Sequence, residues 1–117
     1  MDTRPALGRT GEDIAADHYR ERGFTVVARN YRCPIGELDL VAARGALLVF
    51  CEVKTRRTNR WGDPWEAVGS AKQRRIRRLA GHWLRDNRPG SVEIRFDVVS
   101  VVLEGATAEV EHIPGAF

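Results

Sequence analysis

Two acidic residues and one lysine have the types and spacing needed to hold a metal ion beside a phosphate. Asp39 lies in one strand-like segment, and Glu52 and Lys54 form a Glu-x-Lys triplet in the next. Successive side chains of a strand point to opposite faces, so Glu52 and Lys54 share a face. Carboxylates suit Mg²⁺, which takes few of them and keeps waters and phosphate oxygens as its other ligands. The lysine would then orient a water or stabilise charge developing on a phosphate.

The pairing of these two segments decides whether the acids meet. Arg44-Gly45 is short and turn-like, which predicts an antiparallel hairpin. A loop centred there pairs Asp39 with Phe50 and Glu37 with Glu52. Asp39 and Glu52 then become diagonal neighbours with Cα atoms roughly 7–8 Å apart, close enough to hold one cation. Like charges directly opposite one another are destabilising, so this face needs a compensating cation.

An ion pair on a solvated sheet face is the competing interpretation of the same residues. Lys54 would then only neutralise Glu52 or Glu37, and a Glu-x-Lys triplet alone is too common to exclude this. Three neighbouring features favour the metal site: an acid on the preceding strand, an apolar run that enters the triplet, and a basic loop that follows it.

One long segment of the chain, GELDLVAARGALLVFCEVKTR, resembles the signature of the PD-(D/E)xK nuclease superfamily. The form it resembles is that of the small bacterial YraN-like, UPF0102 group, and the similarity covers nearly the whole chain. It implies a restriction-endonuclease-like, three-layer α/β fold with a mixed central sheet of about five strands between helices. Further residues similar to the group's pattern are Gly11-Glu12, Asn30-Tyr31-Arg32, Gly62-Asp63-Pro64 and Lys72.

The resemblance also implies an activity and roles for single residues. The activity is Mg²⁺-dependent hydrolysis of phosphodiester bonds in DNA, with Mn²⁺ as an alternative cation. Asp39 and Glu52 match the metal-binding acids, Lys54 matches the catalytic lysine, and the backbone carbonyl of Val53 would be a further metal contact. Leu38 stands where the superfamily has a proline, at a position that varies. Branched or flap DNA is implied only by analogy with junction-resolving relatives.

Two further acids, Glu12 and Glu37, are candidates for completing the metal shell. Glu12 lies on the same helical stripe as Ala15 and Tyr19, which should face the protein, and a carboxylate there needs a partner. It resembles the helix-borne glutamate of junction-resolving nucleases. The alternative is a first-turn glutamate that the helix dipole favours. Glu37 shares its strand face with Asp39.

Basic residues gather in the middle of the chain. Lysine and arginine outnumber aspartate and glutamate by 19 to 16, which gives a net charge of +3. Lys72 interrupts the apolar stripe of a predicted helix, so it reaches either solvent or the active site, and the family pattern favours the active site. A cluster of arginines with few acids beside it predicts phosphate contact, against the plainer alternative of a solvated face. These arginines are Arg56, Arg57, Arg60, Arg74, Arg75, Arg77 and Arg78.

Composition predicts one domain over residues 1–117, with 43% apolar residues available for its core. Cys33 and Cys51 lack the spacing of a zinc site or a disulfide framework and are expected to be free thiols. His18, His82 and His112 show no zinc spacing and are interpreted as structural or surface residues. The chain lacks the apolar run of a signal peptide or membrane span, so a cytoplasmic location is expected.

Helix and strand patterns predict the order α, three β, α, β, β. Thr10 is expected to cap a first helix from Gly11 to Arg22. Asp63 is expected to cap a second helix that ends near Asp86. The strands are expected over residues 24–31, 37–43, 47–54, 92–103 and 107–113.

Three functions therefore stay open at the level of sequence. The first is a DNA endonuclease that uses one or two Mg²⁺ ions, acting as a monomer or a homodimer. The second is a catalytically silent nucleic-acid-binding module that keeps the nuclease fold, and the third is a protein-interaction domain whose acidic face is structural. Metal-dependent cleavage separates the first from the others, and steep salt dependence of binding separates the second from the third.

Overall fold

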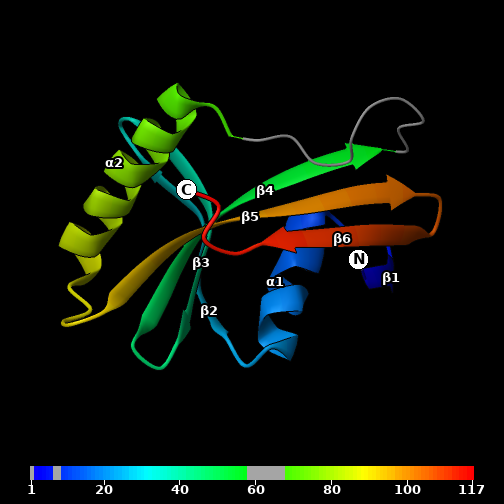
Figure 1. The fold of residues 1–117 in the computed structure, drawn as a ribbon, viewed down its shortest axis with the longest axis horizontal. Coiled ribbons are helices and arrows are strands. Elements are labelled where there is room, and N and C mark those ends of the chain that lie inside the picture. The colour runs from blue at the N-terminus through cyan, green and yellow to red at the C-terminus, as the bar shows by residue number, and fades with distance from the viewer. Residues whose placement is uncertain (1, 7–8, 58–67) are drawn as a thin grey trace.

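The computed structural model describes residues 2–6, 9–57 and 68–117 (Figure 1). Within these ranges the helices and strands account for both predicted helices and all the predicted strands. In chain order the elements are β1 (Asp2–Pro5), α1 (Gly11–Glu21), β2 (Thr25–Cys33), β3 (Gly36–Arg44), β4 (Leu47–Arg57), α2 (Ser70–Asn87), β5 (Glu93–Glu104) and β6 (Thr107–Ile113).

The strands form one mixed sheet in the order β1-β6-β5-β4-β3-β2. β4 and β5 run parallel, and every other neighbouring pair is antiparallel. A parallel pair needs a crossover connection, and the segment between β4 and β5 contains α2. The predicted α/β class with a mixed sheet is confirmed.

The number of strands differs from the prediction, because the sheet has six strands and not five. The additional strand is β1, which pairs with β6 at the edge of the sheet (Figure 1). Its sequence DTRP has no apolar alternation and includes a proline, which suits only an edge strand. Backbone pairing with a distant segment is what makes these residues a strand, so their composition does not indicate it.

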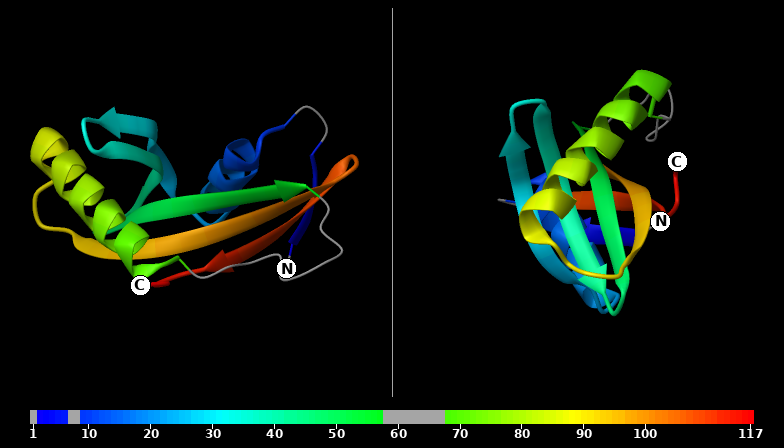
Figure 2. Two further views of the ribbon diagram at one scale, coloured as in Figure 1. Left: turned by 90° about the horizontal axis from the view of Figure 1, so that it is seen from above. Right: turned by 90° about the vertical axis from the view of Figure 1, so that its left-hand side faces the viewer.

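Two apolar cores lie on the two faces of the sheet and complete a three-layer arrangement. β4 shows the division, since Val49 and Cys51 pack in the core under α1 while Leu48 and Phe50 pack in the core under α2. This alternation follows from the strand period of two. The sheet twists along its length, and α2 lies at one end of the molecule while α1 lies nearer to the other end (Figure 2). Neither helix of the described residues has both the length and the apolarity required to cross a membrane.

The first helix begins as predicted, and the second begins later. Thr10 caps α1 through a reciprocal pair of hydrogen bonds with Asp13, of 3.1 and 3.0 Å. α2 starts only at Ser70, because Gly69 has an extended backbone with ψ of 158°. The cap expected at Asp63, together with Pro64, Trp65 and Glu66, lies outside the described residues.

The β3–β4 hairpin has a different register from the one predicted. Its two-residue turn is Gly45-Ala46, which lies one residue later than Arg44-Gly45, and Gly45 has a φ of +58° that suits glycine. The strand pairing therefore shifts by two residues, so that Leu40 lies opposite Cys51. A shift of two leaves each side chain on its original face, because the strand period is two. Asp39 and Glu52 thus stand just beyond the last paired residues of the two strands.

β3 leaves β4 at this point and follows β2 instead. Glu37, which the predicted register placed opposite Glu52, pairs with Arg32 of β2, and Arg32 Nε donates to Glu37 Oε2 at 2.8 Å. Leu38 packs in the core under α2 whereas Leu40 packs in the core under α1. Regular alternation would put these two leucines on one face, so the strand rotates about its axis around Asp39. This rotation, together with the end of the β3–β4 pairing, opens the sheet beside Asp39 and Glu52.

Candidate active site

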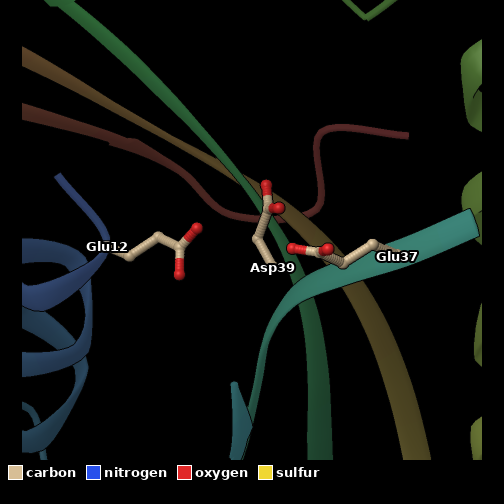
Figure 3. Close-up of side chains that lie close together, drawn as sticks. All are labelled: Glu12, Glu37 and Asp39. Atoms are coloured by element: carbon tan, nitrogen blue, oxygen red, sulfur yellow. The ribbon is translucent and has the colours of Figure 1, made fainter. Parts of the chain in front are cut away.

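Three carboxylates converge at the place where β3 and β4 separate. Glu12 comes from the first turn of α1, and Glu37 and Asp39 come from β3. One oxygen of each carboxylate lies within 4.8 Å of the others, and all three residues are half-buried. In Figure 3 Asp39 lies between the two glutamates. Together with Glu52, which interacts with Asp39, these residues are called the acid cluster.

A close contact between α1 and β4 brings Glu12 to this place. A Cβ atom on Gly11 would lie 1.9 Å from Thr55 Oγ1, so only glycine allows the first turn of the helix to approach the strand so closely. Of the two interpretations of Glu12, the structure places its carboxylate with the other acids. Arg29 balances part of this charge, since its Nη2 lies 3.9 Å from Glu12 and 2.8 Å from Asp13.

Asp39 is the most perturbed member of the acid cluster. Burial and the negative charge of Glu52 raise its pKa to about 7, and a hydrogen bond to Glu52 and the charge of Glu12 act in the same direction. The backbone N–H of Val53 opposes this rise by donating to Asp39 Oδ2 at 2.9 Å. That N–H lies beyond the end of the β3–β4 pairing, so the carboxylate replaces a lost strand partner. Asp39 therefore ionises at neutral pH only at a cost, which a cation would offset.

Glu52 makes an ion pair with a residue from the other helix. Lys72 Nζ of α2 lies 2.5 Å from Glu52 Oε1, and the Glu52 side chain is only 12% exposed. Lys72 thus reaches the acid cluster, although its side chain stays partly exposed to solvent. The surrounding pocket has a volume of about 260 Å³. Its lining consists of Gly36, Glu37, Asp39, Glu52, Lys72, Arg75, Ile76 and Leu79.

Among the described residues, two cationic side chains line this pocket. Lys54 is not one of them. Lys54 lies two residues beyond Glu52 on β4, half-buried and opposite Ser100 of β5. Arg75 lines the pocket with Lys72, although the sequence analysis placed it only in the cluster of arginines expected to contact phosphate. The spacing from Lys72 to Arg75 is i to i+3, which puts both side chains on one helix face, and this signal could have identified Arg75.

The predicted basic surface is divided among different environments. Arg74 and Arg78 are exposed on α2, and Arg57 is exposed at the end of β4. Arg77 instead stacks its guanidinium over two aromatic rings, with Cζ 4.7 Å from the Phe96 centroid and 5.6 Å from the Phe117 centroid. Cation–π contact of this kind stabilises packing, so Arg77 contributes to the fold as well as to the charge. Arg56 is half-buried, and Arg60 lies outside the described residues.

The sequence analysis did not predict the buried hydrogen-bond network around Asp97. Asp97 has no solvent exposure, and it accepts hydrogen bonds from Tyr19 Oη at 2.7 Å and Arg95 Nε at 2.8 Å. His112 Nε2 lies 2.7 Å from the same carboxylate and His18 Nε2 lies 3.0 Å from His112 Nδ1. His18 and His112 therefore belong to a structural hydrogen-bond network, in line with the interpretation of these two histidines as structural or surface residues. A lone acid within the apolar run FDVVSVV is the signal that indicates such a network.

The two cysteines are free, as expected. Cys51 is fully buried beside the acid cluster, one residue before Glu52, and burial raises the pKa of its thiol. Its pKa is raised further by the charges of Asp97 and Asp39, whereas a hydrogen bond with Tyr19 lowers it. The thiol is accordingly a packing group and not a nucleophile.

Comparison with known proteins assigns the chain to a family. The family model described as "Uncharacterised protein family UPF0102" matches residues 11–101, from α1 to β5, and so includes the whole acid cluster. A UPF0102 protein of Syntrophotalea carbinolica is 53% identical over 114 residues, which cover 97% of this chain and 93% of that protein. UPF0102 proteins of Rhodococcus jostii and Dictyoglomus thermophilum are 50% and 42% identical, over 96% and 95% of this chain and 96% of each relative. The chain therefore belongs to the UPF0102 family.

Proposed function

We propose that this protein is a metal-dependent nuclease that hydrolyses phosphodiester bonds in DNA. The observation that carries the proposal is the convergence of Glu12, Glu37 and Asp39 within 4.8 Å of one another, beside Glu52. Like charges gathered in a half-buried place destabilise a protein unless something compensates for them. A divalent cation together with a phosphate group compensates for them most directly.

The donor set fits Mg²⁺ or Mn²⁺. Hard carboxylate oxygens suit these ions, and the group of Glu12, Glu37 and Asp39 contains no histidine nitrogen or cysteine sulfur that would favour zinc. Asp39 and Glu52 would hold the ion, with Glu12, Glu37 and the carbonyl of Val53 as further contacts. When bound, such an ion polarises a phosphate oxygen and lowers the pKa of a water.

The remaining residues of the site act on the substrate. Lys72 and Arg75 present positive charge on the wall of the pocket that holds the acids, where they would bind non-bridging phosphate oxygens. Lys54, which the nuclease resemblance assigns as the catalytic lysine, would stabilise charge on the phosphate from its place two residues beyond Glu52. Exposed Arg74 and Arg78 extend the basic surface along α2, where duplex DNA would bind through its backbone.

A silent nucleic-acid-binding module is the second candidate function, and one observation favours it. Lys72 already neutralises Glu52 at 2.5 Å, as a structural ion pair would in a protein that binds no metal. Such a protein would keep the basic surface and bind DNA without cutting it. Metal-dependent cleavage distinguishes the two functions.

In the decisive assay the purified protein is incubated with single-stranded, duplex, flap and four-way-junction DNA in the presence of Mg²⁺ or Mn²⁺. We expect cleavage that chelator abolishes and that Glu52→Gln removes with little change in DNA binding, because the amide keeps the shape and loses the charge. Glu93→Gln, on an exposed residue of β5, is the matched control and should cleave normally. Cleavage that persists in chelator or in Glu52→Gln would refute the mechanism. Salt-dependent binding without any cleavage would support the silent module.

A further inference from the structure

A second cavity, lined in part by Glu12, lies near the pocket of Lys72 and Arg75. Its volume is about 600 Å³, against about 260 Å³ for that pocket. This volume lies within the range of about 300–1,000 Å³ that small-molecule sites occupy. The lining includes residues from the start of α1, from β2, from β4 and from the end of β5. We call it the arginine cavity.

The arginine cavity and the smaller pocket meet at the acid cluster. Glu12 lines the arginine cavity, and its carboxylate lies within 4.8 Å of the carboxylates of Glu37 and Asp39, which line the pocket. A phosphate at the acids would therefore lie near Lys72 and Arg75 of the pocket and also near the arginine cavity.

Three arginines from separate parts of the chain give the cavity guanidinium groups that can bind an anion. Arg9 precedes α1, Arg29 lies on β2 and Arg57 lies on β4, and all three line the cavity. Asp17 holds Arg9 through Oδ2, and Asp13 holds Arg29 at 2.8 Å. Each of these contacts engages one terminal nitrogen, and a guanidinium has five N–H donors in a rigid fork, so donors remain for an anion.

The N-terminus of α1 is not the source of the hydrogen-bond donors in the arginine cavity. Thr10 and Asp13 form a capping box that already engages the backbone N–H groups of both residues. The side chains of the cavity supply the donors instead, since Thr55 and Asn30 add a hydroxyl and an amide to the three guanidinium groups. The described lining contains no aromatic ring on which a base could stack. The cavity is therefore suited to sugar and phosphate and not to a base.

We propose that the arginine cavity is a phosphate subsite, which holds the backbone of the nucleotide next to the phosphate at the acid cluster. The inference rests on the proposed function and extends it. Binding here is independent of base sequence, because the described lining offers donors for sugar and phosphate and no ring on which a base could stack.

Binding of short single strands tests the subsite without cleavage. The probes are fluorescent oligothymidylates and an abasic strand of equal length, titrated by anisotropy at several salt concentrations in chelator. We expect the double variant Arg9→Gln/Arg57→Gln to weaken binding about tenfold and to flatten the slope of log K against log salt by up to about 1.4, or about 0.7 per phosphate contact. The abasic strand should bind as well as thymidylate.

Arg20→Gln is the matched control, because Arg20 is an exposed arginine on α1 that pairs with Asp17 outside the cavity. It should leave both affinity and slope unchanged. An unchanged slope in the double variant, or an equal change in the control, overturns the subsite, as does failure of the abasic strand to bind. These outcomes are independent of cleavage by the wild-type protein, so the subsite and the nuclease activity fail separately.

If the double variant does not fold, Arg57→Gln alone provides the same test. Arg57 is exposed at the end of β4, so its replacement removes little packing. We expect a change in slope of about 0.7. Its Mn²⁺ affinity, measured calorimetrically, should equal that of the wild type because Arg57 is not part of the acid cluster. A reduced Mn²⁺ affinity without any change in slope would overturn the subsite and assign Arg57 to the metal site.

Discussion

Two aspartates in the same sheet, Asp39 and Asp97, respond to burial in opposite ways. Burial raises the pKa of both carboxyl groups, and in Asp39 the acids around it raise it further, to about 7. In Asp97 hydrogen bonds from His112, Arg95, Tyr19 and the backbone of Gly115 outweigh burial and hold the pKa well below its usual range. Asp39 accepts a hydrogen bond from the backbone N–H of Val53 and faces other carboxylates.

This difference separates a carboxylate that supports the fold from one suited to a ligand. The protein supplies the positive charge and the donors that Asp97 needs, so Asp97 stabilises the native state as an anion. The acids around Asp39 lack an equivalent set of donors and gain from a cation that comes from solution. Perturbed carboxyl groups in a pocket are candidates for function for this reason.

The largest expected effect follows from removing the charge of Asp97. Asp97→Asn should destabilise the protein by about 3–5 kcal/mol, because it leaves Arg95 and other donors facing an amide in a buried place. The identical change at Asp39 relieves repulsion, so in chelator Asp39→Asn should match the wild type or exceed its stability by up to about 1 kcal/mol. Urea unfolding of the two variants gives both values. Equal losses would show that the two aspartates play the same structural role.

Addition of metal should affect the stability of Asp39→Asn and Asp97→Asn in the opposite order. At a Mg²⁺ concentration of about 100 times the dissociation constant, the wild-type protein should gain about 2.7 kcal/mol, because a ligand that binds only the native state stabilises it. Asp39→Asn should lose most of that gain, whereas Asp97→Asn should keep it. Melting temperatures in chelator and in excess Mg²⁺ provide the measurement. An unchanged response in Asp39→Asn would exclude this residue as a metal ligand.

The pH dependence of stability in chelator should reflect the titration of both Asp39 and Asp97. The pKa of Asp39 rises from 3.8 to about 7 on folding, so between these pH values the native state holds a proton that the unfolded state has released. Stability should therefore fall as the pH rises through this range, by about 1–2 kcal/mol after allowance for the solvent around a half-buried group. Asp39→Asn should abolish this decline.

At lower pH Asp97 should dominate with the opposite sign. Its pKa is depressed on folding, so its contribution is complete above the ordinary pKa of 3.8 and is lost as the pH falls towards the depressed value. The same titration of the wild type, extended into acid, measures this loss. A wild-type curve that rises between pH 3.8 and about 7 would contradict the assignment of Asp39.

The smallest expected effect concerns Lys72, the cation that the protein itself supplies to the acid cluster. Its side chain is 48% exposed, so Lys72→Met should cost about 0.5–1 kcal/mol in chelator. The variant should also bind Mn²⁺ more tightly, since Glu52 no longer has a competing partner. Lys54→Met is the matched control and should change neither quantity, although it should abolish cleavage. A Lys72→Met variant with weaker Mn²⁺ binding would make Lys72 a support of the metal site and not a competitor.

The sequence by itself determined most of the local structure. The Thr10 cap, the turn after Arg44 and the β-rich runs place α1 and five of the strands close to their observed bounds, because short-range capping, turn chemistry and periodicity decide these features. The same periodicity predicted that Glu52 and Lys54 share one face of their strand. It also identified Asp39 as a candidate metal ligand on the preceding strand. An error of two residues in register did not change the face of the side chains in the paired part of the hairpin, since the strand period is two.

Only the tertiary structure decided which of these residues meet. Glu12 joins the acids because Gly11 packs on Thr55, and Asp97 finds Tyr19 from 78 residues away and His112 from 15. β1 becomes a strand only because β6 lies beside it. Long-range pairing and close approach of backbones depend on the whole fold and leave no local pattern. For the same reason, the opposite protonation behaviour of Asp39 and Asp97 comes from neighbours that are distant in sequence and adjacent in space.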